Sequence, residues 1–296
     1  MFNLKNKSQL KTFIFFNIIV LFFTFKALAL DTKIPVTNEE WDKAWASLNW
    51  KKGPSVVNYN KANSKINISS NFEILEGTEA HQMLYWLNGV DFSYVDVYAM
   101  GQNSEQYLFY YTDSGYVKTD DWTDVDPDKF IKEMIENYKA SNSTRQQNGQ
   151  ATVMDVTWKK KPYLDGTYNS VYYAFNVTWS DNSSTVEGTA IILGKEGYTT
   201  ASYVGGTDGY QEQLLLNLSK IHKFNTAKEY KDWKSGDKVA AAGIGALLAT
   251  TLGVKALKPG IIAAGLLLFK KFWFIIVLPF IWLGKLFTGS DKKKKK

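Results

Sequence analysis

A long apolar segment near the C-terminus constrains what this chain can fold into more than any other feature. Residues 239–257 carry a single charge, on Lys255. A helix of this length, at about 1.5 Å per residue, spans a hydrocarbon core of roughly 30 Å. We therefore predict one transmembrane helix from Val239 to Leu257, with the residues before it held at the membrane as a separate domain.

A second apolar stretch follows, and it is interrupted by charge. It runs from Ile261 to Phe287 and contains Lys270 and Lys271. Residues 239–287 together form the predicted membrane anchor. Lysines near the middle of a bilayer are costly, so we expect the second stretch to lie along the inner leaflet or to dip into it re-entrantly.

The chain ends in a basic tail, residues 288–296, in which the last five residues are lysine. Positive charge accumulates on the cytoplasmic side of membrane helices, which predicts a cytoplasmic C-terminus and an extracytoplasmic main domain at the inner membrane. The alternative is a hairpin, in which residues 261–283 cross back and export the tail.

The first 29 residues have the pattern of a secretory signal peptide. Lysines precede an apolar core of thirteen residues, Phe13–Phe25, and Ala27-Leu28-Ala29 forms a small-residue cleavage site. The alternative is an uncleaved N-terminal anchor.

The net charge of +6 conceals a division along the chain. Residues 1–29 and 239–296 are basic, whereas residues 30–238 contain seven more acidic than basic residues. An acidic domain is a poor match for a phosphate backbone, so the composition argues against nucleic acid as a partner.

Residues 30–238 are predicted to form one α+β domain. The chain has no cysteine, so this domain must be stabilised by a hydrophobic core. Helices are indicated after the caps Thr37, Thr78, Asp126 and Thr207. Strands are indicated at 55–69 (two strands), 94–100, 107–112, 151–158, 170–179, 184–193 and 198–204. The last four strands are separated by turn residues, which predicts hairpins and an antiparallel sheet with helices packed on it.

Few residues suggest chemistry. His81 and His222 are the only histidines, so a His/Cys metal site has too few ligands, and we interpret both as helix-surface residues. The densest acidic cluster contains Asp120, Asp121 and Asp124. Because it lacks the glycine and glutamate of a calcium loop, we expect no metal and favour acids at a helix N-terminus.

Small residues recur along the predicted membrane helix, at Gly243, Gly245, Ala249 and Gly253. Small-xxx-small faces let helices approach closely, which makes a homo-oligomer one interpretation; incidental glycines are the other.

The chain resembles a bacterial family of uncharacterised membrane-anchored proteins. The resemblance covers Gly53 to about Phe287 and rests on a set of separated residues: Gly53-Pro54, Gly115-Tyr116-Val117, Asp120-Asp121, Asn142, Arg145, Gly149, Trp158, Pro162, Asp165, Leu193-Gly194, Gly197, Phe224, Tyr230, Trp233 and Asp237 to Ala241. It implies a signal peptide, an envelope domain and an anchor, but no activity. The order of elements is also similar to the α/β/α sandwich of PsbP-like lipoprotein domains, by analogy.

The polar residues of that resemblance suggest one candidate site. We predict that Asn142, Arg145, Trp158 and Asp165 form a polar and aromatic cluster, in which Arg145 clamps a carboxylate or a carbonyl. An arginine that ties a loop to the sheet is the alternative interpretation.

The sequence therefore predicts a membrane-anchored envelope protein that binds or scaffolds without catalysis and without a cofactor. Its expected partners are the lipid bilayer and another envelope protein. A ligand or peptide sensor is one alternative, and a hydrolase using Asp120, Asp121 or Asp165 with Arg145 is another.

Overall fold

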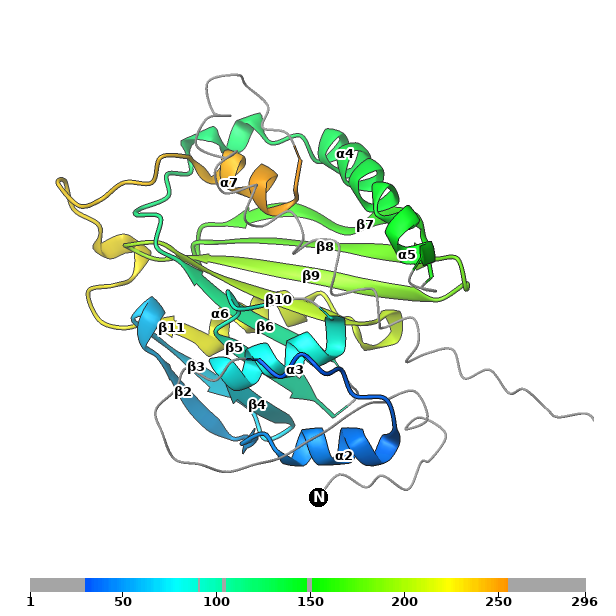
Figure 1. Cartoon of the computed structure of the whole chain (residues 1–296). Coiled ribbons are helices and arrows are strands. Elements are labelled where there is room, and N and C mark those ends of the chain that lie inside the picture. The colour runs from blue at the N-terminus through cyan, green and yellow to red at the C-terminus, as the bar shows by residue number, and fades with distance from the viewer. Residues whose placement is uncertain (1–29, 90, 103–104, 148–150, 255–296) are drawn as a thin grey trace, which may run out of the picture.

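A large antiparallel sheet forms the centre of the structure (Figure 1). The computed structural model describes residues 30–89, 91–102, 105–147 and 151–254. The eight strands lie in the order β1 (Lys51–Lys52), β4 (Phe72–Glu76), β5 (Val97–Gly101), β6 (Gln106–Thr112), β10 (Tyr198–Gly206), β9 (Ser184–Leu193), β8 (Ser170–Trp179) and β7 (Val153–Asp165). All neighbours pair antiparallel. The predicted hairpins and the predicted fold class, an antiparallel sheet with packed helices, are confirmed.

Helices cover one face of this sheet, which we call the helix face. They are α2 (Asn38–Ala46), α3 (Thr78–Asn88), α4 (Pro127–Ala140), α5 (Asn142–Gln147) and α7 (Ile244–Thr251). Residues of α2 and α3 pack on β4 to β6, whereas residues of α4 and α7 pack on β7 to β10. Two separate groups of helices therefore pack on the helix face.

The opposite face of the large sheet is covered by one helix and a second, smaller sheet. We call it the cleft face, because a cleft described below opens on it. It packs against α6 (Gln213–Ile221) and a three-stranded antiparallel sheet in the order β11 (His222–Phe224), β3 (Ser64–Ile68) and β2 (Ser55–Tyr59). Four short 3-10 helices complete the description: η1 (Asn60–Ala62), η2 (Asp120–Asp124), η3 (Thr207–Gly209) and η4 (Tyr230–Asp232).

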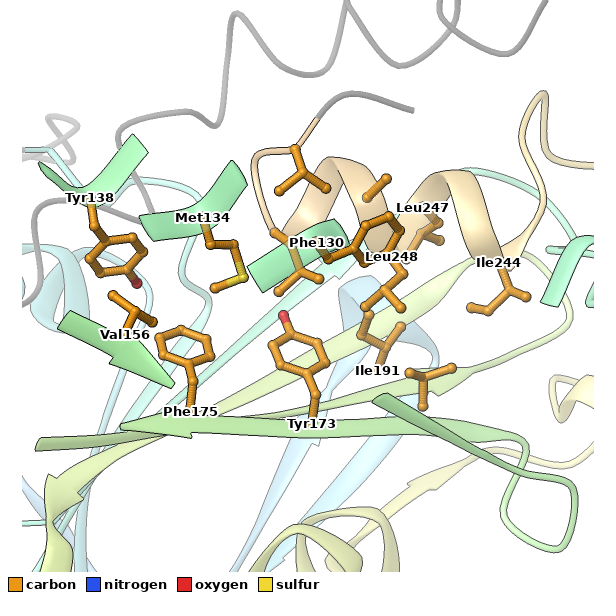
Figure 2. Packing of buried hydrophobic residues seen from close by; sticks show 14 of the residues in the cluster. Phe130, Met134, Tyr138, Val156, Tyr173, Phe175, Ile191, Ile244, Leu247 and Leu248 are labelled. Carbon is orange, nitrogen blue, oxygen red and sulfur yellow. The ribbon is translucent and has the colours of Figure 1, made fainter. Parts of the chain in front are cut away.

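Helix α4 shows how local sequence produces this packing. Asp126 caps its first turn by accepting hydrogen bonds from the amides of Asp128 and Lys129, at 3.1 and 3.0 Å. Phe130, Met134 and Tyr138 recur at helical spacing and are fully buried over the sheet (Figure 2). Each buried side chain of this kind contributes roughly 1.5–3 kcal/mol of hydrophobic stabilisation.

The C-terminal segment corrects the predicted membrane helix. Residues 239–243 are not helical, and α7 has only eight residues. Ile244, Leu247 and Leu248 pack into the same core as α4 (Figure 2). The predicted span Val239–Leu257 is therefore wrong for its described part, and the domain extends beyond residue 238. None of the helices in the described ranges is long and apolar enough to cross a membrane.

The small residues of this segment also have a different role from the one predicted. Gly243 and Gly245 lie against Asp121, and a Cβ at Gly245 would sit 2.9 Å from the Asp121 carbonyl oxygen. Ala249 is buried in the core, and Gly253 follows the helix with φ +68°. These four residues therefore do not form an open helix face for self-association.

Other sequence predictions differ in detail. Gly77 stands at the N-cap position of α3 in place of Thr78, and Thr207 begins η3 rather than α6. β4 was not predicted. The predicted signal peptide (1–29), the end of the predicted span (255–257), the whole second apolar stretch (261–287) and the basic tail (288–296) lie outside the described residues.

Candidate functional site

The four residues of the predicted polar cluster do not meet. Asn142 binds the backbone of Val153 at the start of β7, through bonds of 2.9 and 2.8 Å. Asp165 ends the same 13-residue strand, where it accepts the Thr167 amide at 2.8 Å. At about 3.3 Å per residue, that strand separates the two ends by roughly 35–40 Å. The prediction of one cluster is therefore wrong.

Arg145 and Trp158 support the sheet from separate positions. The Arg145 side chain is 1% exposed; its Nε donates to Ser141 Oγ at 3.1 Å, and its guanidinium lies 4.8 Å from the Trp179 ring centre. Burial lowers the pKa of Arg145. Trp158 Nε1 donates to the Pro127 carbonyl at 2.9 Å. The alternative interpretation, an arginine that ties a local segment to the sheet, describes the geometry of Arg145.

One member of the acidic cluster, Asp121, caps a helix. Asp121 accepts hydrogen bonds from the amides of Gly245 and Ala246, at 3.0 and 3.2 Å, and so caps α7. Asp120 and Asp124 lie with it in η2. The described residues contain no group of three or more acidic, histidine or cysteine side chains that could hold a metal ion. The interpretation as acids at a helix N-terminus is confirmed for Asp121, although the helix it caps is distant in sequence.

Both histidines have structural contacts. His81 Nε2 lies 2.7 Å from the Val95 carbonyl. His222 belongs to β11 rather than a helix surface, is 3% exposed, and contacts Thr199 Oγ1 at 3.0 Å. Burial lowers the pKa of His222 to about 3. The surface interpretation of His222 is therefore wrong.

A cleft of about 430 Å³ opens on the cleft face, between the sheet, α6 and the end of β3. Its sheet side is apolar and includes Ala99, Tyr107 and Phe109. These side chains point to this face because alternate residues of β5 and β6 do so. Phe72 of β4 meets Tyr107 edge to face at 5.0 Å, which fixes the two rings beside each other.

The rim of the cleft is polar. Asn67, Gln211, Asn217 and Lys220 line it, and all four side chains are exposed. Asn67 Nδ2 also donates to the Ile221 carbonyl at 3.1 Å, which joins β3 to the end of α6. Lys220 is the one charged residue among the described residues that line the cleft. An apolar interior with a few polar groups at its mouth is typical of a small-molecule site.

No pattern in the sequence indicated this cleft. Its lining comes from the end of β3, from β4 to β6 and from α6, which are separated by more than one hundred residues. Leu214, Leu218 and Ile221 recur at helical spacing, which indicates the apolar face of a helix, and all three line the cleft. The pattern indicated burial, but nothing in it indicated that the opposing sheet would leave a space.

Many residues that carry the family resemblance meet at one end of the large sheet. The Tyr116 ring stacks on Tyr230 and Trp233, with centres 4.4 and 4.8 Å apart. Lys195 Nζ lies 3.1 Å from Asp237 Oδ2. The hydrogen bond from the Lys234 amide, followed by the bond to Lys195, lowers the pKa of Asp237.

The close approach of the Phe224 ring explains the glycine at position 194, which is one of the residues that carry the family resemblance. A Cβ at Gly194 would lie 2.6 Å from the Phe224 ring, so a larger residue would displace the ring. Tyr116 also exchanges backbone hydrogen bonds with Lys238 and Ala240, both at 2.9 Å. These contacts hold the segment before α7 against the sheet, which is a structural role.

The model of a family described as "Protein of unknown function (DUF2167)" matches residues 51–281. The chain belongs to this family. The predicted resemblance to a family of unknown function is thereby confirmed, and membership assigns no activity.

Comparisons with curated proteins and with solved structures assign no activity to the chain. No curated protein matches the chain. The structure is similar to the solution structure of cyanobacterial PsbP (CyanoP) from Synechocystis sp. PCC 6803, at 12% sequence identity and a TM-score of 0.33, covering 58% of this chain and 92% of that one. This similarity is too low to support an inference about the present chain.

Proposed function

We propose that this protein is a non-catalytic binding domain whose ligand occupies the cleft beside α6. The cleft itself carries the proposal, because its volume of about 430 Å³ lies within the range of small-molecule sites. Its apolar interior suits a hydrocarbon or aromatic body, and the amides and Lys220 at the rim suit a polar end. The ligand class is therefore a small amphipathic molecule.

The hydrolase alternative has less support. It required Asp120, Asp121 or Asp165 to act together with Arg145. Asp121 accepts two backbone amides of α7, and Asp165 accepts the turn amide of Thr167. Arg145 lies buried over Trp179. These residues are thus committed to separate structural contacts.

We also propose that the domain is extracytoplasmic and anchored in a bacterial inner membrane. The support is sequence: the signal-like residues 1–29, the apolar stretch Ile261–Phe287, and the basic tail. Since the buried side chains of residues 244–254 belong to the domain core, the anchor is assigned to residues after 254. A single crossing there leaves the tail in the cytoplasm, as the positive charge favours.

Anchoring at this point would orient the cleft. The chain leaves the described domain beside α4, where Asn137 Nδ2 donates to the Gly253 carbonyl at 2.7 Å. This point lies on the helix face, and the cleft opens on the opposite face. The cleft would therefore face away from the bilayer and towards soluble ligands.

Binding of an apolar fluorescent probe, 1-N-phenylnaphthylamine, tests the cleft. The wild-type protein should bind it saturably. Leu214→Glu places a charge in the cleft wall and should weaken binding at least tenfold. Leu216→Glu is the matched control, because Leu216 is also half-buried on α6 but does not line the cleft. Absence of saturable binding, or equal loss in both variants, would reject the site.

Cysteine accessibility tests the topology, because the chain contains no cysteine of its own. Ser235 is exposed in the turn before α7, and Ser290 belongs to the basic tail. In intact cells, a membrane-impermeant thiol reagent should label Ser235→Cys and leave Ser290→Cys unlabelled. Labelling of both would establish the hairpin, and labelling of neither would place the domain in the cytoplasm.

A further inference from the structure

A second cavity lies on the helix face, away from the cleft. It has a volume of about 80 Å³ and is lined from β6, β8, β9 and β10 on the sheet and from α4 and α7 above it. Figure 2 shows the adjoining core, with Met134 and Tyr138 of α4 above Phe175 of β8. All three of these residues also line the cavity.

A buried carboxyl group borders this cavity. Glu187 of β9 is 6% exposed, and its Oε2 accepts a hydrogen bond from the Tyr138 hydroxyl at 2.9 Å. Its Oε1 is buried without a hydrogen-bond partner. A buried polar atom in this state destabilises the fold, and more so when it is charged, so hydrophobic stabilisation does not explain why Glu187 is present.

The other lining residues favour a cation. Among those that the structure describes, Glu187 is the one acid and no lysine or arginine lines the cavity. Aromatic rings surround it, namely those of Tyr94, Tyr110, Tyr138 and Phe175. Ring faces attract ammonium groups, and this attraction strengthens when water is excluded. Thr189 and Ser202 add hydroxyl oxygens that can accept hydrogen bonds.

Burial accounts for the charge state of Glu187 in the empty cavity. The Arg145 guanidinium lies over Trp179 and is not part of the cavity lining, but its charge acts on Glu187. Burial raises the pKa of Glu187, whereas the Tyr138 bond and Arg145 oppose that rise. The carboxyl group can therefore be neutral in the empty cavity and ionised beside a cation.

We propose that this cavity binds the ammonium group of a small primary amine, with Glu187 as its counter-ion. A water molecule occupies roughly 30 Å³ of liquid, so the cavity accommodates a group the size of methylammonium. Tetramethylammonium carries the same charge but has no N–H group, so it cannot donate a hydrogen bond to the Glu187 carboxylate. This site is independent of the cleft on the opposite face.

Thermal unfolding and calorimetry of the full chain test the site, with methylammonium chloride as the probe and sodium chloride at equal ionic strength as the reference. Methylammonium should raise the unfolding temperature saturably, and tetramethylammonium should bind at least tenfold more weakly. Glu187→Gln should weaken methylammonium binding at least tenfold. Glu73→Gln is the matched control, because Glu73 is also buried but lies on β4 outside the cavity.

Two results would overturn the proposal. One is an equal effect of sodium and methylammonium, which would mean that the cavity holds only water. The other is unchanged binding in Glu187→Gln. If Glu187→Gln does not fold, Ser202→Leu tests the site instead: the larger side chain occupies the cavity from β10 and leaves the hydrogen bond between Tyr138 and Glu187 in place, so it should abolish binding.

Discussion

Helices α4 and α7 lie side by side on the same sheet, but their sequences indicate burial in different ways (Figure 2). In α4, buried Phe130, Met134 and Tyr138 alternate with charged residues that face solvent. In α7, six of eight residues are buried and none is charged. A helix that is apolar on all sides belongs either to a protein core or to a membrane. Composition alone does not separate the two.

The length and the capping of α7 show that it is a core helix and not a membrane helix. Eight residues span about 12 Å, far less than a hydrocarbon core. The cap of α7 comes from Asp121, which is 124 residues away from Gly245, whereas the cap of α4 is the adjacent Asp126. An apolar helix whose start is fixed by a distant acid is thus recognised as core only when the fold is known.

The substitution with the largest expected effect, Leu248→Asp, tests whether α7 is part of the core. Leu248 is fully buried between α4 and the sheet. Leu248→Asp would bury an unpaired charge, which should cost at least about 5 kcal/mol and prevent folding of the domain. Urea unfolding followed by tryptophan fluorescence measures it.

Ala241→Asp is the control for that change, because Ala241 is exposed just before α7. It should alter the free energy of unfolding by less than about 0.5 kcal/mol. If Leu248→Asp leaves the domain as stable as Ala241→Asp does, α7 is not part of the core, and the comparison with α4 fails.

Strand bounds, helix caps and hairpins depend on residues close together in the chain, and these features were predicted from the sequence. The strands at 170–179 and 184–193 were predicted within a residue, because turn residues such as Asp181-Asn182 bound them. Thr37 and Asp126 were identified as caps by the same local logic. The antiparallel order of β7 to β10 then followed from their short connections.

The cleft and the positions of the candidate site residues depend on contacts between distant segments, and these features were not predicted from the sequence. The cleft needs the end of β3 opposite α6, and the separation of Asn142 from Asp165 depends on how far β7 extends. Glu187 is an acid within an apolar strand, which gives a weak signal of a special environment. Its importance emerges only when Tyr138 and the cavity are placed beside it.

His222, like α7, is buried by partners that are distant in sequence, and its burial has a measurable consequence. Its pKa is lowered from 6.5 to about 3, so folding should weaken as pH falls below 6.5, because the unfolded chain binds the proton first. At 1.36 kcal/mol per pKa unit, the loss between pH 7 and pH 5 is about 2 kcal/mol. Urea unfolding at the two pH values measures it.

His222→Gln provides the comparison for that experiment, since it is neutral throughout and retains a hydrogen-bonding group for Thr199. The variant should lose about 2 kcal/mol less stability between pH 7 and pH 5 than the wild type. Equal losses in both proteins would show that His222 is accessible to protons in the folded state.

A smaller effect tests the distant cap of α7. Asp121→Ala removes the acceptor for the amides of Gly245 and Ala246. Loss of such a cap should reduce the free energy of unfolding by about 1–2 kcal/mol. Asp120→Ala is the control from the same 3-10 helix and should cost less than about 0.5 kcal/mol. Equal costs would mean that α7 does not depend on Asp121.

The smallest expected effect concerns the local cap of α4. Asp126→Ala removes the acceptor for the amides of Asp128 and Lys129, and it should cost about 1 kcal/mol. The cap is exposed and its partners are adjacent, so the change should fray only the first turn, and amide exchange at those two positions should accelerate while exchange at Tyr138 does not. Asp121→Ala, by contrast, should also accelerate exchange in α7 as a whole, because its contact joins two segments. If the two variants perturb exchange over equally short ranges, the distinction between a local and a distant cap is lost.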